Sequence, residues 1–329
     1  MTVKRLVAAS IVAFGLSLAV CASEARAADK VTLRAAWSWA PDQTPFFVAQ
    51  AKGFYKDANL EVEILQGQGS KTTSLVVGQG KDTFGINSLA TTAASISADV
   101  PVKAVAGYWQ RGPIGLICDA ARNVKTPADL KGLTIASTPS GSDGQLLPPF
   151  LSANKLGMQD IKTVALTDAK LPALLTGKVD CISGDVYYWQ PLAEEQGKKT
   201  TGLLYADYGI TNLSFGLIAN TDFIAKNPDI VRRFVAASLK GVEYAHANID
   251  EAADIFLKAT GSTQSKTFVT GVLAYWKGQT HTQATAGKPL GWIATEDWNQ
   301  MNDILEKYGD MKGRKPTEVY FTNDFLPKK

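Results

Sequence analysis

Short apolar segments alternate with helical segments along most of the chain, and this alternation limits the fold more than any other sequence feature. Residues 31–37, 60–65 and 82–86 have the composition of buried strands, and a segment with helical patterning follows each of them. Such alternation is typical of α/β proteins, in which helices cover both faces of a sheet. We therefore predict an α/β fold of mostly parallel sheets flanked by helices.

Capping residues set the expected ends of several helices. Thr126, Pro127 and Asp129 have the spacing of a cap, a first helical residue and a first-turn acid, which predicts a one-turn helix. Asn227 and Pro228 begin a longer helix in the same way, and a left-handed glycine is expected at Gly78. The predicted helices span residues 44–55, 70–77, 88–98, 227–247, 250–260, 265–278 and 295–308.

The N-terminal segment has the pattern of a secretory signal peptide. Lys4 and Arg5 precede fifteen uncharged residues, and an Ala-Arg-Ala sequence ends at Ala27, as signal peptidases require. We predict a signal peptide over residues 1–27 and export to the periplasm. Lipid anchoring at Cys21 is not expected because Val20 precedes it. No later apolar run reaches the roughly 18 residues of a membrane helix, so a soluble mature chain is expected.

Length and composition exclude several classes. The 329 residues suggest two domains, and 34 Lys and Arg against 31 Asp and Glu leave no basic surface for nucleic acid. Two histidines and three cysteines offer little for a metal site or a disulfide framework. Cys118 and Cys181 could pair in an oxidising compartment, but both lie in apolar stretches. Free, buried thiols are the expectation.

Aromatic and hydroxyl side chains gather where the predicted strands end. Ligands bind outside the carboxyl ends of strands in open α/β sheets, and flat rings stack on planar ligands. Each tryptophan could instead simply cover the core. The candidate ligand-binding residues are Trp37, Trp39, Asn87, Ser88, Tyr108, Trp109, Ser140, Gly141, Ser142, Asp185 and Tyr188.

Enzyme motifs are missing from the sequence. Asp42, Asp143 and Asp185 have no spacing that joins them in acid–base work, and His246 and His281 are expected at the solvated surface. No nucleophile elbow, zinc-ligand spacing or dinucleotide glycine motif occurs, so no catalytic residue, metal or cofactor is predicted. The 140–142 loop could bind an anion through backbone N–H groups, although it lacks the end of a P-loop.

One internal similarity suggests two lobes of related plan. Residues 75–85 and 174–184 each contain a helix end, a glycine, an acid and a buried strand that ends in glycine. Two lobes built on the same βαβ pattern would produce this similarity. Chance would also produce it, because αβ loops share these signals widely.

The chain resembles the periplasmic solute-binding proteins of ABC importers that take thiamine pyrimidine precursors, riboflavin, taurine, aliphatic sulfonates and nitrate. The motifs that carry the resemblance occur in family order and cover nearly the whole mature chain. They are residues 39–55, 60–62, 78–85, 100–102, 129–136, 177–180 and 227–234.

The resemblance implies a two-lobed Venus flytrap fold of type II. Lobe 1 would hold residues 28–112 plus 210–329, and lobe 2 residues 113–209. A small molecule would bind between the lobes and favour their closure. The expected partners are an ABC permease and ATPase in the inner membrane, and the protein is expected to be a monomer.

The resemblance implies different ligand classes for two loops of the chain. Pyrimidine-precursor binders stack aromatics at the position of Trp37 and Trp39, so a planar heteroaromatic ligand, thiamine-precursor-like or riboflavin-like, is predicted. Sulfonate and nitrate binders rely on the loop that matches residues 140–142, which leaves a small organic anion as the alternative. Two other classes stay open, a sensory-accessory receptor and a pyrimidine synthase. The synthases of this wider family use an active-site histidine and a cysteine-rich motif, whereas this chain has neither that cysteine cluster nor a histidine at a predicted strand end.

Overall fold

The structure is a computed structural model that describes residues 27–210, 213–308, 311 and 313–328. The predicted signal peptide, with Cys21, lies outside these residues except for Ala27. Within the described ranges, no helix is long and apolar enough to cross a membrane.

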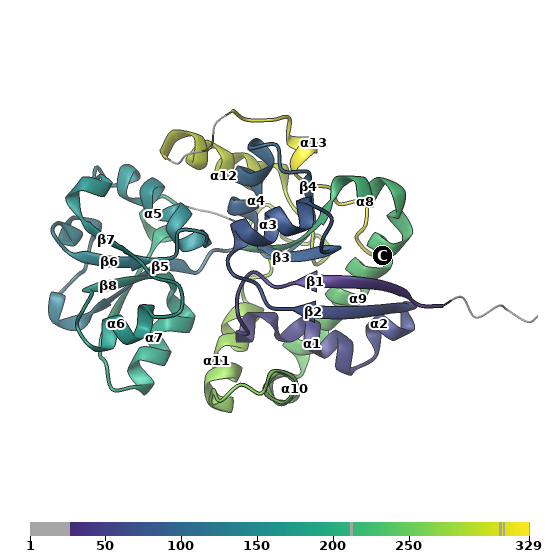
Figure 1. Ribbon diagram of the computed structural model, residues 1–329, viewed down its shortest axis with the longest axis horizontal. Helices are drawn as coiled ribbons and strands as arrows, with labels where there is room; N and C mark the ends of the chain where they lie inside the picture. The colour runs from purple at the N-terminus through teal and green to yellow at the C-terminus, as the bar shows by residue number, and fades with distance from the viewer. Residues whose placement is uncertain (1–26, 211–212, 309–310, 312, 329) are drawn as a thin grey trace, which may run out of the picture.

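Two five-stranded sheets form two lobes, which lie side by side in Figure 1. The strand order is β2-β1-β3-β10-β4 in lobe 1 and β7-β6-β8-β5-β9 in lobe 2. In each sheet four strands point the same way, and one strand, β10 or β5, runs antiparallel to both neighbours. The fold is therefore the predicted one, α/β with mostly parallel strands.

The strands of lobe 1 are β1 (Asp29–Arg34), β2 (Leu60–Leu65), β3 (Phe84–Ser88), β4 (Val102–Trp109) and β10 (Phe215–Asn220). Those of lobe 2 are β5 (Ile114–Asp119), β6 (Thr134–Ser137), β7 (Lys162–Ala165), β8 (Cys181–Asp185) and β9 (Thr200–Leu204). All five residues of β3 are buried, as expected for a central strand covered by helices on both faces.

Helices cover both sheets. Lobe 1 carries η1 (Pro41–Gln43), α1 (Thr44–Ala51), α2 (Phe54–Asp57), α3 (Ser70–Gly78), α4 (Leu89–Ser97), α8 (Thr221–Lys226), α9 (Pro228–Ala247), α10 (Ile249–Thr260), α11 (Lys266–Lys277), α12 (Thr295–Tyr308) and α13 (Thr317–Tyr320). Lobe 2 carries η2 (Ala120–Arg122), η3 (Pro127–Leu130), α5 (Ser142–Ala153), η4 (Met158–Asp160), α6 (Lys170–Leu175), α7 (Val186–Glu195) and η5 (Tyr205–Tyr208).

Helix α9 shows how sequence pattern and packing agree. It begins at Pro228 after Asn227, as predicted, and its apolar face is buried. Phe234 stacks on Phe84 of β3 with 3.8 Å between ring centroids, which fixes the helix against the sheet. Helix α1 crosses α9 at Gly241, where an added Cβ would lie 2.3 Å from the carbonyl oxygen of Pro45. Glycine is needed there for close approach.

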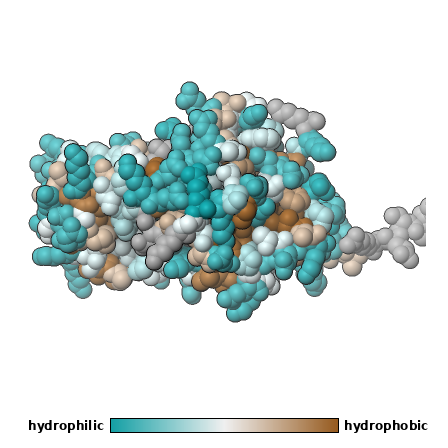
Figure 2. All heavy atoms as spheres, turned by 90° about the horizontal axis from the view of Figure 1, so that it is seen from above, coloured by the Kyte–Doolittle hydropathy of each residue, from teal (hydrophilic) through white to brown (hydrophobic). Residues whose placement is uncertain are grey.

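Apolar packing continues from one lobe into the other. The chain passes from β4 into β5 and returns from β9 to β10. One core cluster joins Leu89 and Ile218 of lobe 1 to Leu116 and Tyr205 of lobe 2, and α5 contacts α12. Outside these cores, hydrophobic residues are scattered over a mostly hydrophilic surface in the view of Figure 2.

Several predicted element ends shift. The helix expected over residues 44–55 is two helices, because Gly53 adopts a left-handed conformation with φ 78° between them. The left-handed conformation expected at Gly78 is wrong, since Gly78 is the last residue of α3 and Gly80 takes that conformation instead. A Cβ on Gly78 would lie 2.6 Å from Val100. Close packing therefore explains that glycine.

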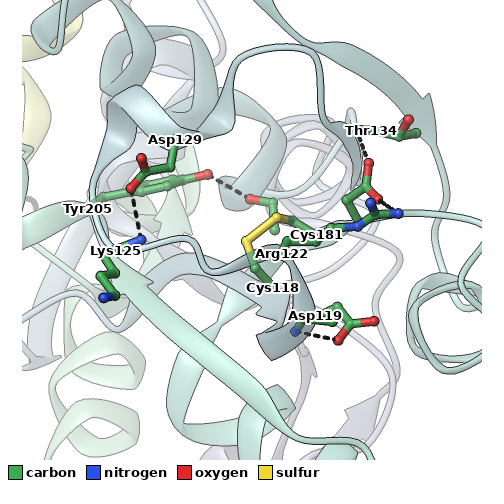
Figure 3. The surroundings of a disulfide bond; sticks show 11 residues. Cys118, Asp119, Arg122, Lys125, Asp129, Thr134, Cys181 and Tyr205 are labelled. Atoms are coloured by element: carbon green, nitrogen blue, oxygen red, sulfur yellow. Dashed lines mark hydrogen bonds and ion pairs between the residues drawn. A yellow bond between two sulfur atoms is a disulfide. The ribbon is translucent and has the colours of Figure 1, made fainter.

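The expectation of free thiols is also wrong. Cys118 of β5 and Cys181 of β8 form a disulfide between directly opposed residues, with Cα atoms 4.0 Å apart (Figure 3). Both residues are fully buried. The two cysteines are 63 residues apart in sequence, so their pairing depends on the antiparallel register of β5 and β8, which the sequence does not display.

The internal similarity has a structural counterpart. Residues 75–85 form the end of α3 and the start of β3, and residues 174–184 form the end of α6 and most of β8. Strands β3 and β8 both occupy the third place in their sheets. The two lobes therefore share one strand plan.

Candidate functional site

A cavity of about 250 Å³ lies between the lobes. Its wall combines aromatic rings, carboxyl groups and small polar residues from the ends of β1, β6 and β8 and from α7 and α11. The aromatic residues in the lining are Trp37, Trp39, Tyr188, Trp189, Phe215 and Trp276. The charged residues in the lining are Asp42, Asp143, Asp168, Lys170 and Asp185.

The loop after β1 brings Trp37 and Trp39 into the cavity wall. Its backbone is held to the neighbouring loop, since Gly67 donates to the carbonyl of Trp37 at 2.9 Å. A Cβ on Gly67 would clash with the carbonyl oxygen of Ala35 at 1.9 Å, so this approach requires glycine. Trp39 packs edge-on against Phe47 at 5.1 Å between centroids. Both tryptophans are half-buried, which leaves part of each available to a ligand.

A second aromatic wall comes from α11. Trp276 stacks on the fully buried Trp109 with ring centroids 4.2 Å apart and planes 16° apart. Its indole N–H is buried and has no hydrogen-bond partner among the described residues. A buried donor without a partner is costly. The Trp276 N–H is thus a group that a ligand acceptor could satisfy.

Lobe 2 contributes an internal ion pair. The Lys170 ammonium lies 2.9 Å from Asp143 Oδ2 and donates to the carbonyl of Ser183 at 2.7 Å. It also lies 5.6 Å from the ring centroid of Trp189. Asp143 accepts a further hydrogen bond from the backbone N–H of Thr138 at 3.0 Å. Both charges are therefore engaged within the lobe before any ligand arrives.

Two other acids of the cavity lining, Asp42 and Asp185, form no ion pair within the described residues. Asp185 ends β8 and caps α7, because its Oδ1 accepts from the backbone N–H of Tyr188 at 3.1 Å. Burial and the charge of Asp42 raise the pKa of Asp185 to about 8. Burial also raises the pKa of Asp42 to about 7. Neither acid forms a salt bridge within the described residues, so the cavity holds two carboxyl groups that titrate near neutral pH.

The two rims of the cavity bring the lobes into contact. On one side, the Ser140 hydroxyl donates to the carbonyl of Gln68 at 3.1 Å, and Lys71 donates through its backbone N–H to the Ser140 carbonyl. On the other side, α7 meets α11 (Figure 1). There Tyr187 stacks on Tyr275 with 3.5 Å between ring centroids. The structure is thus a closed arrangement.

The predicted site residues divide into two groups. Trp37, Trp39, Gly141, Ser142, Asp185 and Tyr188 line the cavity together. The residues that do not line it are Asn87, Ser88, Tyr108, Trp109 and Ser140.

Each residue of the second group has a structural contact. Asn87 donates to Ser74 and Thr92, and Ser88 caps α4. Trp109 supports Trp276 from behind, and Ser140 joins the rim. Tyr108 is fully buried and packs edge-on against Phe46 with 5.3 Å between ring centroids, and its hydroxyl has no hydrogen-bond partner among the described residues.

Sequence reasoning missed Lys170, Val272 and Trp276. Lys170 follows β7, a strand that the sequence did not suggest because all four of its residues are exposed. Val272 and Trp276 are four residues apart on α11, so they lie on one helix face. Nothing in the local sequence shows that this face meets the second lobe.

The histidines lie away from the cavity. His246 and His281 line a different pocket, beside α9 and the loop after α11. The expectation that His246 is solvated is wrong, because it is buried in α9 with 9% exposure. Burial and the nearby Lys277 lower its pKa to about 4. No histidine or cysteine occurs among the residues that line the interlobe cavity.

Residues 40–252 match the NMT1/THI5-like family, which is more than half of the chain. The chain belongs to this family. Among its relatives, the riboflavin-binding protein RibY of Chloroflexus aurantiacus is 28% identical over 299 residues, or 86% of this chain and 82% of RibY. A 4-amino-5-hydroxymethyl-2-methylpyrimidine phosphate synthase of Candida albicans is 28% identical over 238 residues, 68% of this chain and 69% of the synthase. Relatives of this NMT1/THI5-like chain thus include proteins named as binders and as enzymes.

Solved structures share the fold of this NMT1/THI5-like chain. The alkanesulfonate-binding protein SsuA from Xanthomonas axonopodis pv. citri, bound to MOPS, superposes with a TM-score of 0.69 and covers 90% of this chain and 99% of SsuA. Identity is 14%, so this similarity establishes the two-lobed periplasmic-binding-protein fold and nothing about the ligand.

Proposed function

We propose that this chain is the exported substrate-binding component of an ABC importer and that it binds a small planar heteroaromatic molecule between its lobes. The ligand would be a thiamine pyrimidine precursor or riboflavin-like compound. The observation that carries the proposal is a cavity walled by aromatic rings in which the one lysine of the lining is already paired with Asp143.

The charges of the cavity favour such a ligand over an anion. Asp42 and Asp185 have no cationic partner among the described residues, and Lys170 is neutralised by Asp143. A sulfonate or nitrate would therefore find no unpaired cation among the described residues of the lining, and ionisation of either acid would repel it. A neutral or cationic heterocycle with N–H donors would be attracted by the same groups.

In the loop considered for anion binding, residues 140–142 and the adjoining Thr138, backbone N–H groups already donate to acceptors within the protein. The backbone N–H of Thr138 donates to Asp143, and that of Gly141 donates to the Thr138 carbonyl at 2.9 Å. A Cβ on Gly141 would lie 2.4 Å from Asp143 Oδ1. The carboxylate of Asp143 thus takes the place that a ligand anion would need.

The aromatic residues supply the apolar contacts for a flat ring. Trp37 and Trp39 come from lobe 1, and Tyr188 comes from lobe 2. Rings of this kind contribute about 0.5–1.5 kcal/mol per aromatic pair beyond the area that they bury. Because the rings come from both lobes, a stacked ligand would favour the closed state that a permease could recognise. We assign residues 28–112 with 210–329 to lobe 1, residues 113–209 to lobe 2, and a monomeric state to the protein.

A binding role is favoured over the synthase activity named for some relatives. The cavity lining contains no histidine or cysteine, and the two histidines of the sequence line another pocket. General acid–base or nucleophilic steps would fall to the carboxyl, hydroxyl and lysine side chains of the lining. We expect bound ligand to be recovered unchanged, which mass spectrometry of the released ligand would check.

A thermal-shift screen tests the proposal. The panel would contain pyrimidines, flavins, sulfonates, nitrate and aromatic carboxylates. A ligand at about 100 times its dissociation constant stabilises the folded state by about 2.7 kcal/mol, which is readily detected. We expect stabilisation by flat heterocycles. Stabilisation by anions alone would overturn the proposal and return the aromatic residues to a packing role.

A further inference from the structure

Asp42 and Asp185 approach the cavity from opposite lobes. Asp42 lies in η1, directly after the loop that follows β1. Asp185 lies at the end of β8 in lobe 2, where one of its oxygens caps α7. Both line the same cavity, and both are half-buried. Closure of the lobes therefore brings two carboxyl groups into one space.

The groups around this pair do not neutralise it. Tyr188 lies close enough for the charge of Asp42 to raise its pKa, which burial and that charge bring to about 12. The buried Tyr108 also lies near Asp42, and Tyr275 lies near Asp185 with Tyr187 stacked on it. At neutral pH these phenols are uncharged hydrogen-bonding groups.

The nearby cations are bound elsewhere or lie outside. Lys170 contacts Asp143 and the Ser183 carbonyl. Arg111 is exposed beside Tyr275 and does not line the cavity. Asp168, at the mouth, adds a further negative charge. Within the described residues, the Asp42–Asp185 pair thus has no cation of its own.

Two carboxylates close together in a shielded site repel each other. The closed protein can relieve that repulsion in two ways. It can keep protons on the pair, or it can bind a ligand whose positive charge lies between the two acids. The pKa values of about 7 for Asp42 and about 8 for Asp185 indicate that protons remain on the pair at neutral pH when no positive charge lies between the two acids.

We propose that the ligand is a cationic, amino-substituted heteroaromatic, held between Asp42 and Asp185, and that its binding displaces protons from this pair. The aromatic walls stabilise such a cation as well, since the faces of Trp39 and Tyr188 attract positive charge. This inference rests on the proposed function, because it specifies the charge of the planar ligand assigned to the same cavity.

The test uses two probes that differ in charge, 4-amino-2-methylpyrimidine and its permanently cationic form methylated on a ring nitrogen. Isothermal titration calorimetry at pH 7 in two buffers of different ionisation enthalpy gives the number of protons released. We expect about one proton for the cationic probe. Its affinity should also rise about tenfold between pH 6 and pH 8, since each released proton contributes up to a factor of ten per pH unit.

Matched variants separate the pair from other effects. In Asp42→Asn and in Asp185→Asn, proton release and the rise of affinity with pH should both fall by at least half. Asp57→Asn removes the same charge from an exposed position on α2, and it should keep both. Circular dichroism of each variant establishes that it is folded.

The outcomes distinguish the inference from the proposed function. If the neutral probe or riboflavin binds without proton release while the cation does not bind, the heteroaromatic function stands and the cationic ligand is wrong. An affinity for the cation that falls with increasing pH would also overturn the inference. If no heterocycle binds at any pH, the proposed function fails and the inference fails with it.

Discussion

The loops after β1 and β6 occupy equivalent places, since each strand is second in its sheet. Each loop leads to a helical segment with an acid in its first turn, Asp42 in η1 and Asp143 in α5. Asp143 is paired with Lys170 and with the N–H of Thr138. Asp42 has no comparable partner within the described residues. The same place in the fold thus holds an ion-paired acid in lobe 2 and, in lobe 1, an acid that lines the cavity without such a partner.

Among the variants that test this difference between the lobes, Lys170→Met should have the largest effect on stability. The side chains of Lys170 and Asp143 are 4% and 9% exposed, so removal of the lysine leaves a buried carboxylate without its counter-ion. We expect a loss of about 3–5 kcal/mol in the free energy of unfolding, measured by urea denaturation. The exposed Lys178→Met variant should change by less than about 0.5 kcal/mol. Equal effects of the two variants would show that Asp143 needs no partner.

Lobe 2 has a second internal constraint in its disulfide, and no described pair of cysteines lies in lobe 1. Replacement of Cys118 and Cys181 by alanine should lower the free energy of unfolding by about 2–4 kcal/mol, because the unfolded chain loses its cross-link. Reductant should lower the melting temperature of the wild-type protein toward that of the double variant. A melting temperature unchanged in both experiments would contradict the contribution of the disulfide.

On the lobe 1 side, Trp39→Ala should weaken ligand binding. A half-buried ring in the cavity wall that stacks on the ligand contributes about 1–3 kcal/mol to binding. Titration calorimetry with a heterocycle found in the thermal-shift screen measures this loss. Trp292→Ala removes a half-buried tryptophan that does not line the cavity, and its affinity should equal that of the wild type. If Trp39→Ala binds equally well, stacking on Trp39 is wrong.

Local signals in the sequence predicted most elements of the fold. Alternating burial, the Asn227–Pro228 helix start and the capping of residues 127–130 by Thr126 depend on contacts within a few residues. These features could therefore be predicted without knowledge of the tertiary structure. The strand β7 could not, because its exposed residues lack the apolar pattern of a strand.

The lining of the cavity was predictable only where it follows strand ends. Trp37, Trp39 and Asp185 were predicted to lie near one another because each follows or ends a strand, and all three line the cavity. Trp276 was missed because its place in the cavity depends on how α11 meets the other lobe. The pairing of Cys118 with Cys181 and the burial of His246 likewise depend on contacts between segments far apart in sequence. A single sequence carries little information about such contacts.

The smallest predicted effect is a pH-dependent change in stability that distinguishes Asp42 from Asp143. Because burial raises the pKa of Asp42 in the folded protein to about 7, the folded state binds more protons than the unfolded state above pH 4. Its stability therefore falls as pH rises from about 4 to 7. Asp42→Asn removes this loss and should be more stable than the wild type at pH 8, on the order of 1 kcal/mol after allowance for partial exposure. The difference should vanish near pH 4.

Asp143→Asn should instead lose stability at pH 8, since it breaks the pair with Lys170. Urea denaturation of both variants at pH 4 and pH 8 measures these differences, and a loss of stability in both at pH 8 would mean that the two acids play the same structural role.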